Sequence, residues 1–462
     1  MKINNKLPIM KKVLLLAMLV IAAQSGFSQD FGKVRNMVLL KQYETAKPEV
    51  DKLAADPKAQ AKAETWFWKG TVYAELAKDP LVAKYPNAWK EANDAFKKYA
   101  ELDPSFAIVK ANTADGYFTM YSTAYGSAIK EYNNKKWEEA AQLFETANNY
   151  MGTIIKNKWT NANIAFDTTA VLYSAYAYTN AKKLDEAARA YTIIADNKIG
   201  GENYSEAYKF LVVYYTTQKN EPQFRKYLAI ARELYPKDPW DDYEAEYMDK
   251  NMTLDEKIAT YDKEDAANTL NDTKYFQFGD VFVKAKNSDK IDSAKQAAFA
   301  AKAIDAFKKS YGKNPQNALA AFNAGVLYYN AYVEYDDKYA ANIRAMQAIN
   351  ADRPAEKDPK KKAAADAALK AKTDPIKAQN VQIEKPLMEN LDKAIEWLEK
   401  SYTILKDKPN RDKVEKSVIN KDVDFLANLY AYKRDKLRGK DAKAFDMYDA
   451  KYKEFDALHM KY

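Results

Sequence analysis

The sequence predicts an all-α protein built from consecutive pairs of helices, and three observations lead to this. Ala, Lys, Tyr, Asp and Glu dominate the composition, while only 12 Gly and 15 Pro interrupt the 462 residues, which favours helices over disorder. A chain of this length exceeds the ~250 to 300 residues at which one core stops growing. We therefore expect several domains or an extended array. Residues 208–236 contain two helical patterns joined by a turn, with no insertion.

The stretch 208–236 carries one complete helix pair. Apolar side chains recur at three- and four-residue intervals, which places them on one face of each helix. The first helix carries Tyr208, Leu211, Val212 and Tyr215, the second carries Phe224, Leu228 and Ala231, and Pro236 closes the unit. This order resembles the tetratricopeptide repeat (TPR), a helix-turn-helix of ~34 residues with the pattern W-x2-L-G-x2-Y, A-x3-F, P. The resemblance implies an all-α, TPR-type right-handed α-solenoid of about nine helix pairs.

Two other units match the repeat closely. One spans Trp66 to Pro104 and the other Tyr275 to Pro315. Each has a glycine in its first helix, Gly70 or Gly279, where one helix is expected to pass so close to its neighbour that a side chain would clash. The domain boundaries follow from these units: N-terminal TPR units at 30–104, central units at 105–236, degenerate and insertion-containing units at 237–338, and C-terminal units with a cap at 387–462.

Residues 339–386 depart from the repeat pattern. They are rich in Lys and Ala and contain Pro354, Pro359 and Pro375, each of which disfavours helix in the residue before it. We therefore expect at most two short helices on a flexible excursion. Acidic residues offset most of the lysines, so a solvated loop is favoured over an arm that docks onto an anionic surface.

Residues 1–28 are typical of a secretory signal peptide. Four lysines precede an apolar run from Val13 to Ala23, and cleavage is expected after Ser28. The run is too short to span a bilayer, which needs ~20 residues. The sequence has no cysteine, so it offers neither a disulfide nor a lipid-modified Cys. We expect a chain exported to the periplasm, or alternatively secreted, without a membrane anchor.

Charge and residue content disfavour nucleic-acid binding and catalysis. Removing residues 1–29 leaves 69 basic against 65 acidic side chains, and a net charge of +4 gives no nucleic-acid footprint. The single histidine, His459, lies near the C-terminus, so no catalytic triad, Cys-His pair or HExxH zinc site can be assembled. No P-loop or dinucleotide fingerprint is present. We expect no enzyme, no cofactor and no metal site.

The resemblance also implies where a partner would bind, because the first helices of TPR pairs line a concave groove. The groove positions are occupied by Phe67, Tyr125, Tyr176, Lys209, Phe276 and Phe322. Only Lys209 has the character of the Lys/Asn clamp that grips a C-terminal carboxylate. An aromatic, mostly apolar groove suits an extended peptide or an amphipathic helix. We expect Phe67, Tyr125, Phe276 and Phe322 to be partly exposed, and Trp66, Tyr73, Tyr215 and Phe307 to be buried.

Several interpretations of function remain open. The leading one is a non-catalytic periplasmic TPR scaffold that binds protein or peptide partners in its concave groove. A glycan-binding protein of nutrient uptake, using surface Tyr and Trp, is the alternative, although the missing lipid-modifiable Cys counts against it. An enzyme is the least favoured. The groove rings could also simply pack against neighbouring helices.

We predict that the mature chain begins near Gln29 or Asp30 and is recovered without detergent, because the only long apolar run is removed with the signal peptide. N-terminal sequencing and fractionation of cells that express the full chain measure this. Retention of Met1, or recovery wholly with membranes at high salt, contradicts the prediction.

Overall fold

The computed structural model describes residues 31–288, 291–352 and 358–462. Within these ranges every long regular element is an α-helix and no strand is present, which confirms the predicted all-α fold. The chain divides into two compact units, one ending at Tyr243 and the other beginning at Glu244. The predicted signal peptide, residues 1–28, lies outside the described residues.

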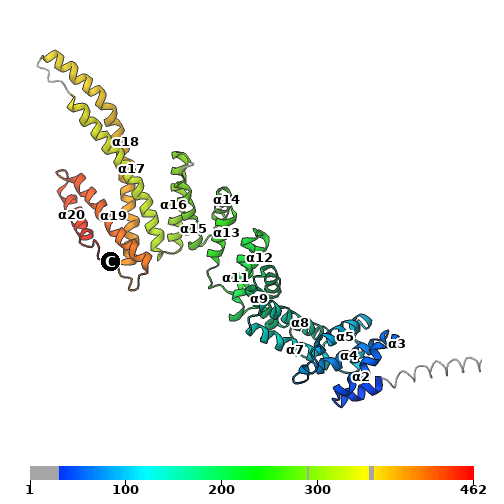
Figure 1. Cartoon of the computed structure of the whole chain (residues 1–462). Coiled ribbons are helices and arrows are strands. Elements are labelled where there is room, and N and C mark those ends of the chain that lie inside the picture. Colours follow the sequence, from blue (N-terminus) through cyan, green and yellow to red (C-terminus); the bar gives the residue numbers. More distant parts are fainter. Residues whose placement is uncertain (1–30, 289–290, 353–357) are drawn as a thin grey trace, which may run out of the picture. The chain divides into compact units, whose positions relative to one another are not determined.

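The first unit consists of helix pairs joined by short linkers (Figure 1). Its helices are residues 31–39, α2 (Tyr43–Ala55), α3 (Pro57–Gln60), α4 (Ala63–Leu76), η1 (Leu81–Ala83), α5 (Ala88–Leu102), α6 (Ala107–Ala111), α7 (Asp115–Asn133), α8 (Trp137–Lys156), α9 (Thr168–Asn180), α10 (Leu184–Asp196), η2 (Glu202–Tyr204), α11 (Ser205–Thr217) and α12 (Glu221–Leu234). The pairs α4/α5, α7/α8, α9/α10 and α11/α12 each form within the unit, and each of the first three also contacts the pair that follows it. They therefore stack in sequence order.

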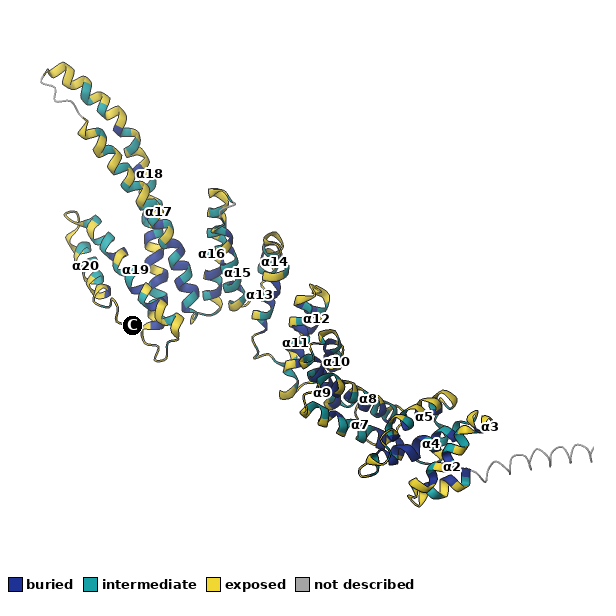
Figure 2. Ribbon diagram, in the orientation of Figure 1, coloured by how far each residue is buried: buried dark blue, intermediate teal, exposed yellow. Residues whose placement is uncertain are grey.

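The second unit is built in the same way. Its helices are the end of α13 (Trp240–Asn251), α14 (Leu254–Ala266), α15 (Asp272–Lys286), α16 (Ser293–Lys313), α17 (Ala318–Ala351), α18 (Pro359–Lys406), α19 (Lys413–Leu437) and α20 (Ala442–Asp456). The pairs α15/α16, α17/α18 and α19/α20 stack in order. Buried residues line the faces between these helices (Figure 2). Contacts between the two helices of a pair are seen in the described residues for seven of the about nine pairs that the sequence predicts.

The turn inside several pairs depends on one lysine in the left-handed backbone region. Lys135, Lys182 and Lys219 have φ values of 60°, 62° and 54°. In each case the next residue's N–H donates to a carbonyl five residues back, for example Lys183 N to Tyr178 O at 2.9 Å. This bond closes the first helix in the Schellman manner. The chain can then reverse within about three residues and start the second helix.

Each of three pairs brings a large side chain of its second helix onto a glycine of its first. A Cβ built on Gly70 would lie 2.8 Å from the Phe96 ring, and one built on Gly279 would lie 2.5 Å from the Phe307 ring. Gly325 has the same relation to Leu398, at 2.8 Å. No real Cβ fits at such distances, so these glycines allow close helix contact, as the sequence predicts for Gly70 and Gly279.

The expectation of a flexible excursion with short helices at 339–386 is wrong. This segment instead extends α17 and α18, which pack against each other along a projecting helical hairpin. Its far end is largely exposed (Figure 2). Half-buried or buried side chains recur along α18 at spacings of four and three: Leu369, Thr373, Ile376, Asn380, Ile383 and Leu387. Alternating spacings of four and three residues are those of the contact seam between the helices of a coiled coil.

The prolines inside α18 do not break it. Pro375 and Pro386 lie within the helix, and each removes one backbone donor. The carbonyls that lose their partners belong to Ala371 and Gln382, which are exposed and can bind water instead. Across the seam, the Asn342 side-chain amide donates to Asn380 Oδ1 at 2.8 Å. A polar pair of this kind favours one register of two packed helices.

We predict that Gly70→Ala lowers the free energy of unfolding by about 1 to 3 kcal/mol, because the new methyl group would overlap the buried Phe96 ring. Gly126 in α7 is the matched control, since nothing lies within 4 Å of a Cβ built there. Gly126→Ala should stabilise the protein by up to about 1 kcal/mol through helix propensity. Chemical denaturation measures both variants. Similar effects of the two substitutions would contradict the close contact.

Candidate functional site

One pocket of the first unit contains two of the predicted groove residues, Tyr176 and Lys209. It lies between α9 and α11, the first helices of two consecutive pairs, and has a volume of about 620 Å³. We call it the α9–α11 pocket. Its walls include Tyr176, Tyr191, Lys209, Phe210, Val213 and Tyr214.

The pattern of α11 explains which of its side chains face the pocket. Lys209, Phe210, Val213 and Tyr214 are separated by one, three and one residues, so they form one stripe of the helix. Leu211 and Val212, between them in sequence, are fully buried on the opposite side. Because Leu211 and Val212 are held in the core, the opposite face of α11, which carries Lys209, Phe210, Val213 and Tyr214, lines the pocket.

Aromatic rings form a continuous wall of the pocket. The ring centroids of Tyr176 and Tyr191 are 6.2 Å apart, those of Tyr191 and Phe210 are 4.7 Å apart, and those of Phe210 and Tyr214 are 6.0 Å apart. Beside them, Val213 is 44% exposed and Leu184 is 47% exposed. The pocket thus presents large apolar groups to solvent, which is typical of sites that receive an apolar group of a ligand or partner.

The polar groups of the pocket are already paired. Lys209 Nζ lies 3.0 Å from Glu206 Oε1 and 3.4 Å from Asp238 Oδ2, and the bond to Glu206 is the main reason that the pKa of Lys209 is raised. The Tyr214 hydroxyl donates to Asp185 Oδ1 at 2.7 Å, and this bond raises the pKa of Tyr214 to about 12. Lys209 is therefore not a free cation that could grip a carboxylate.

The expectation that Phe67 is exposed in a groove is wrong. Its side chain is 1% exposed and packs on Trp68 and Tyr99, with ring centroids 4.7 and 5.6 Å away. The physical reason is that α4 contacts α2, α5 and α7, so helices cover most of its surface. A helix with buried residues on nearly all sides offers no free wall.

Phe322 is also buried, contrary to the expectation. It packs against Phe425 of α19, with ring centroids 6.4 Å apart, because α19 covers this side of α17. Tyr125 and Phe276 are half-buried, as expected. Each also contacts a ring of the second helix of its own pair: Tyr125 lies 5.5 Å from Phe144, and Phe276 lies 5.4 Å from Phe307. The structure does not gather these four rings into one pocket with Tyr176 and Lys209.

Of the four residues expected in the core, two are buried and two are only half-buried. Tyr73 and Phe307 are buried, which confirms the expectation. Trp66 is only half-buried, and its indole N–H donates to the Gln60 carbonyl at 2.8 Å at the surface, whereas Trp68 takes the buried place. Tyr215 is also half-buried, and its ring stacks on the buried Tyr227, with ring centroids 5.5 Å apart.

Sequence reasoning missed Phe210 and Tyr214, which supply much of the pocket wall. Phe210 directly follows the predicted groove position Lys209, and Tyr214 lies one helical turn beyond Phe210 on α11. The TPR pattern assigns one groove position to each turn of the first helix of a pair. The pocket is wider than this and also includes the residue next to that position. The sequence signal that points to both is a pair of aromatic residues four apart, next to a predicted groove position.

The described residues show neither a cluster of metal ligands nor a membrane-spanning helix. Among them, no group of three or more His, Cys, Asp or Glu side chains is arranged to hold a metal ion. None of the helices described is both long and apolar enough to cross a membrane.

Comparisons with known proteins give little beyond helical structure. No family model matches the chain, and no curated protein matches it. Several solved structures match, among them a chain of the Naa15/Naa10 complex bound to HypK-THB. This chain is 12% identical to that one, and the match covers 93% of this chain and 80% of that chain with a TM-score of 0.19. A score this low means that the two chains do not superpose along their length.

Proposed function

We propose that the chain is a non-catalytic scaffold that binds an apolar segment of a protein or peptide in the α9–α11 pocket. The observation that carries this proposal is the ring wall of Tyr176, Tyr191, Phe210 and Tyr214 beside the exposed Val213. A partner that covers these groups removes apolar surface from water at little entropic cost, because the rings are held by their neighbours.

The charge of the pocket favours an internal apolar segment over a free C-terminus. Lys209 is shared between Glu206 and Asp238, so a carboxylate arriving there would compete with two acids for one cation. A pocket of about 620 Å³ is large enough for a few apolar side chains. An amphipathic helix or an extended strand presents side chains in this way.

Two further parts of the proposal rest on the sequence. The chain is proposed to be exported to the periplasm, and the support is the lysine-rich start and apolar run within residues 1–28. It is proposed not to be an enzyme, because its one histidine, His459, and its lack of cysteine leave few groups for nucleophilic or acid-base chemistry near neutral pH.

We predict that a display library of short random peptides, selected on the purified chain, yields sequences enriched in Leu, Phe, Trp or Met. Val213→Asp should weaken binding of the selected peptides by about 1 to 3 kcal/mol, because it places a carboxylate on the apolar wall. Val381→Asp is the matched control: Val381 is 71% exposed on α18 and lies outside the pocket. Calorimetry with the two variants measures the difference, and melting curves check that both remain folded.

The variant Lys209→Ala distinguishes binding of an internal apolar segment from recognition of a C-terminal carboxylate. Because Lys209 is paired internally, its loss should change affinity less than threefold, equally for peptides with a free and an amidated C-terminus. A large loss confined to free C-termini would contradict the proposal. So would selection of acidic peptides only, or tight binding of neutral oligosaccharides that Val213→Asp abolishes.

A further inference from the structure

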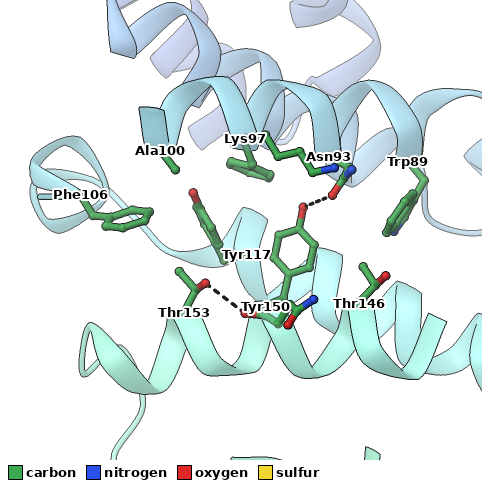
Figure 3. Close-up of a pocket in the computed structure, with 11 residues that line it drawn as sticks. Trp89, Asn93, Lys97, Ala100, Phe106, Tyr117, Thr146, Tyr150 and Thr153 are labelled. Carbon is green, nitrogen blue, oxygen red and sulfur yellow. Dashed lines mark hydrogen bonds between the residues drawn. The ribbon is translucent and has the colours of Figure 1, made fainter. Parts of the chain in front are cut away.

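A second hollow of the first unit lies between the second helices α5 and α8. Figure 3 shows these helices as two facing walls, with Tyr117 of α7 and Phe106 between them. We call it the α5–α8 cavity; its volume is about 380 Å³. Along α5, Trp89, Asn93 and Lys97 are four residues apart, and along α8, Thr146, Tyr150 and Thr153 are four and three apart, so each set occupies one helix face.

Tyr117 is the feature that points to a ligand. Its side chain is only 3% exposed, and its hydroxyl is buried without a hydrogen-bond partner among the described residues. The hydroxyl points toward Ala100 on the α5 side of the cavity (Figure 3). Burial raises the pKa of Tyr117, so the group remains a neutral hydroxyl and a donor near neutral pH. A buried donor without an acceptor is unfavourable, and an acceptor in the cavity would satisfy it.

The walls suit a flat ring. Tyr117 lies 4.4 Å from Phe96, 5.9 Å from Tyr150 and 6.0 Å from Phe106, measured between ring centroids. These rings meet at tilted or edge-on angles, and all four belong to the lining of the cavity. An apolar cavity of ~150 Å³ holds one benzene ring. The larger volume here therefore leaves room for a ring with a polar substituent.

The polar lining offers both donors and acceptors, and among the described residues its charged group is the Lys97 ammonium. Lys97 is exposed at the edge of the cavity, and no acidic side chain belongs to the lining within the described part of the chain. Asn93 Oδ1 already accepts from the Tyr150 hydroxyl at 3.0 Å, which leaves the Asn93 NH₂ group as a donor. The hydroxyls of Thr146 and Thr153 donate to carbonyls of their own helix, so they offer a ligand only acceptor lone pairs. What favours an anionic group over a neutral one is the positive charge of Lys97 together with the Tyr117 donor.

We propose that the α5–α8 cavity binds a small planar aromatic carboxylate. The ring lies among Trp89, Tyr117 and Tyr150, and the carboxylate faces the α5 wall, where it accepts hydrogen bonds from the Tyr117 hydroxyl and the Lys97 ammonium group. This site is separate from the α9–α11 pocket and does not depend on peptide binding there.

Direct titration of the whole purified chain tests this. The probes are phenylacetate and indole-3-acetate, their neutral amides, and glucose, each followed by calorimetry and ligand-observed NMR. At least one acid should bind with a dissociation constant below the millimolar range, and its amide should bind about tenfold more weakly because the charge-assisted bonds are lost. Equal binding of acid and amide, binding of glucose alone, or no binding of either acid would overturn the proposal.

Two variants assign the contacts. Tyr117→Phe keeps the ring and removes only the unpaired hydroxyl, and Lys97→Ala removes the cation; each should weaken binding of the acid about tenfold. Lys98→Ala is the matched control, because Lys98 is also exposed on α5 but pairs with Glu101 at 3.0 Å outside the cavity. Affinity that is unchanged in both Tyr117→Phe and Lys97→Ala, or that falls equally in Lys98→Ala, would also overturn the assignment.

Discussion

The close contact of a large side chain with a glycine is the constraint on which three of the helix pairs depend. Phe96 packs on Gly70 and also lies 2.6 Å from a Cβ built on Gly116, so one ring joins its own pair to the next. Phe307 and Leu398 make the same contact inside two pairs of the second unit. At these points the glycine lets the side chain of one helix reach the backbone of the other, so the two helices of the pair pack closely.

Two of the hollows in the first unit differ in their chemistry. In the α9–α11 pocket, charged groups are paired with one another, as Lys209 is with Glu206, and the remaining surface is aromatic and aliphatic. In the α5–α8 cavity, the buried Tyr117 hydroxyl has no acceptor among the described residues, and the lining cation is Lys97. The first is suited to an apolar segment, and the second to an anion that carries a ring.

The sequence predicted the pairs where each element of the repeat was present, as at Trp66 to Pro104, because glycine, aromatic and proline positions together determine two helices and their contact. It failed where a residue's effect depends on its neighbours. The prolines of 339–386 were interpreted as helix breakers, yet exposed carbonyls and the seam through Asn380 tolerate them. The burial of Phe67 and Phe322 depends on which helices cover α4 and α17, and the repeat pattern contains no such information. The polar balance of either hollow depends on side chains from three helices, so spacing within one helix could not predict it.

The most direct test of the scaffold account is photo-crosslinking of a selected peptide to the chain. A photo-reactive phenylalanine derivative would replace Val213 in the α9–α11 pocket or, separately, Val381 on α18; both side chains are exposed. The account predicts a crosslinked product with position 213 and none with position 381, and competition by unlabelled peptide. Crosslinking at position 381 but not at position 213, with a peptide that binds the chain, would contradict it.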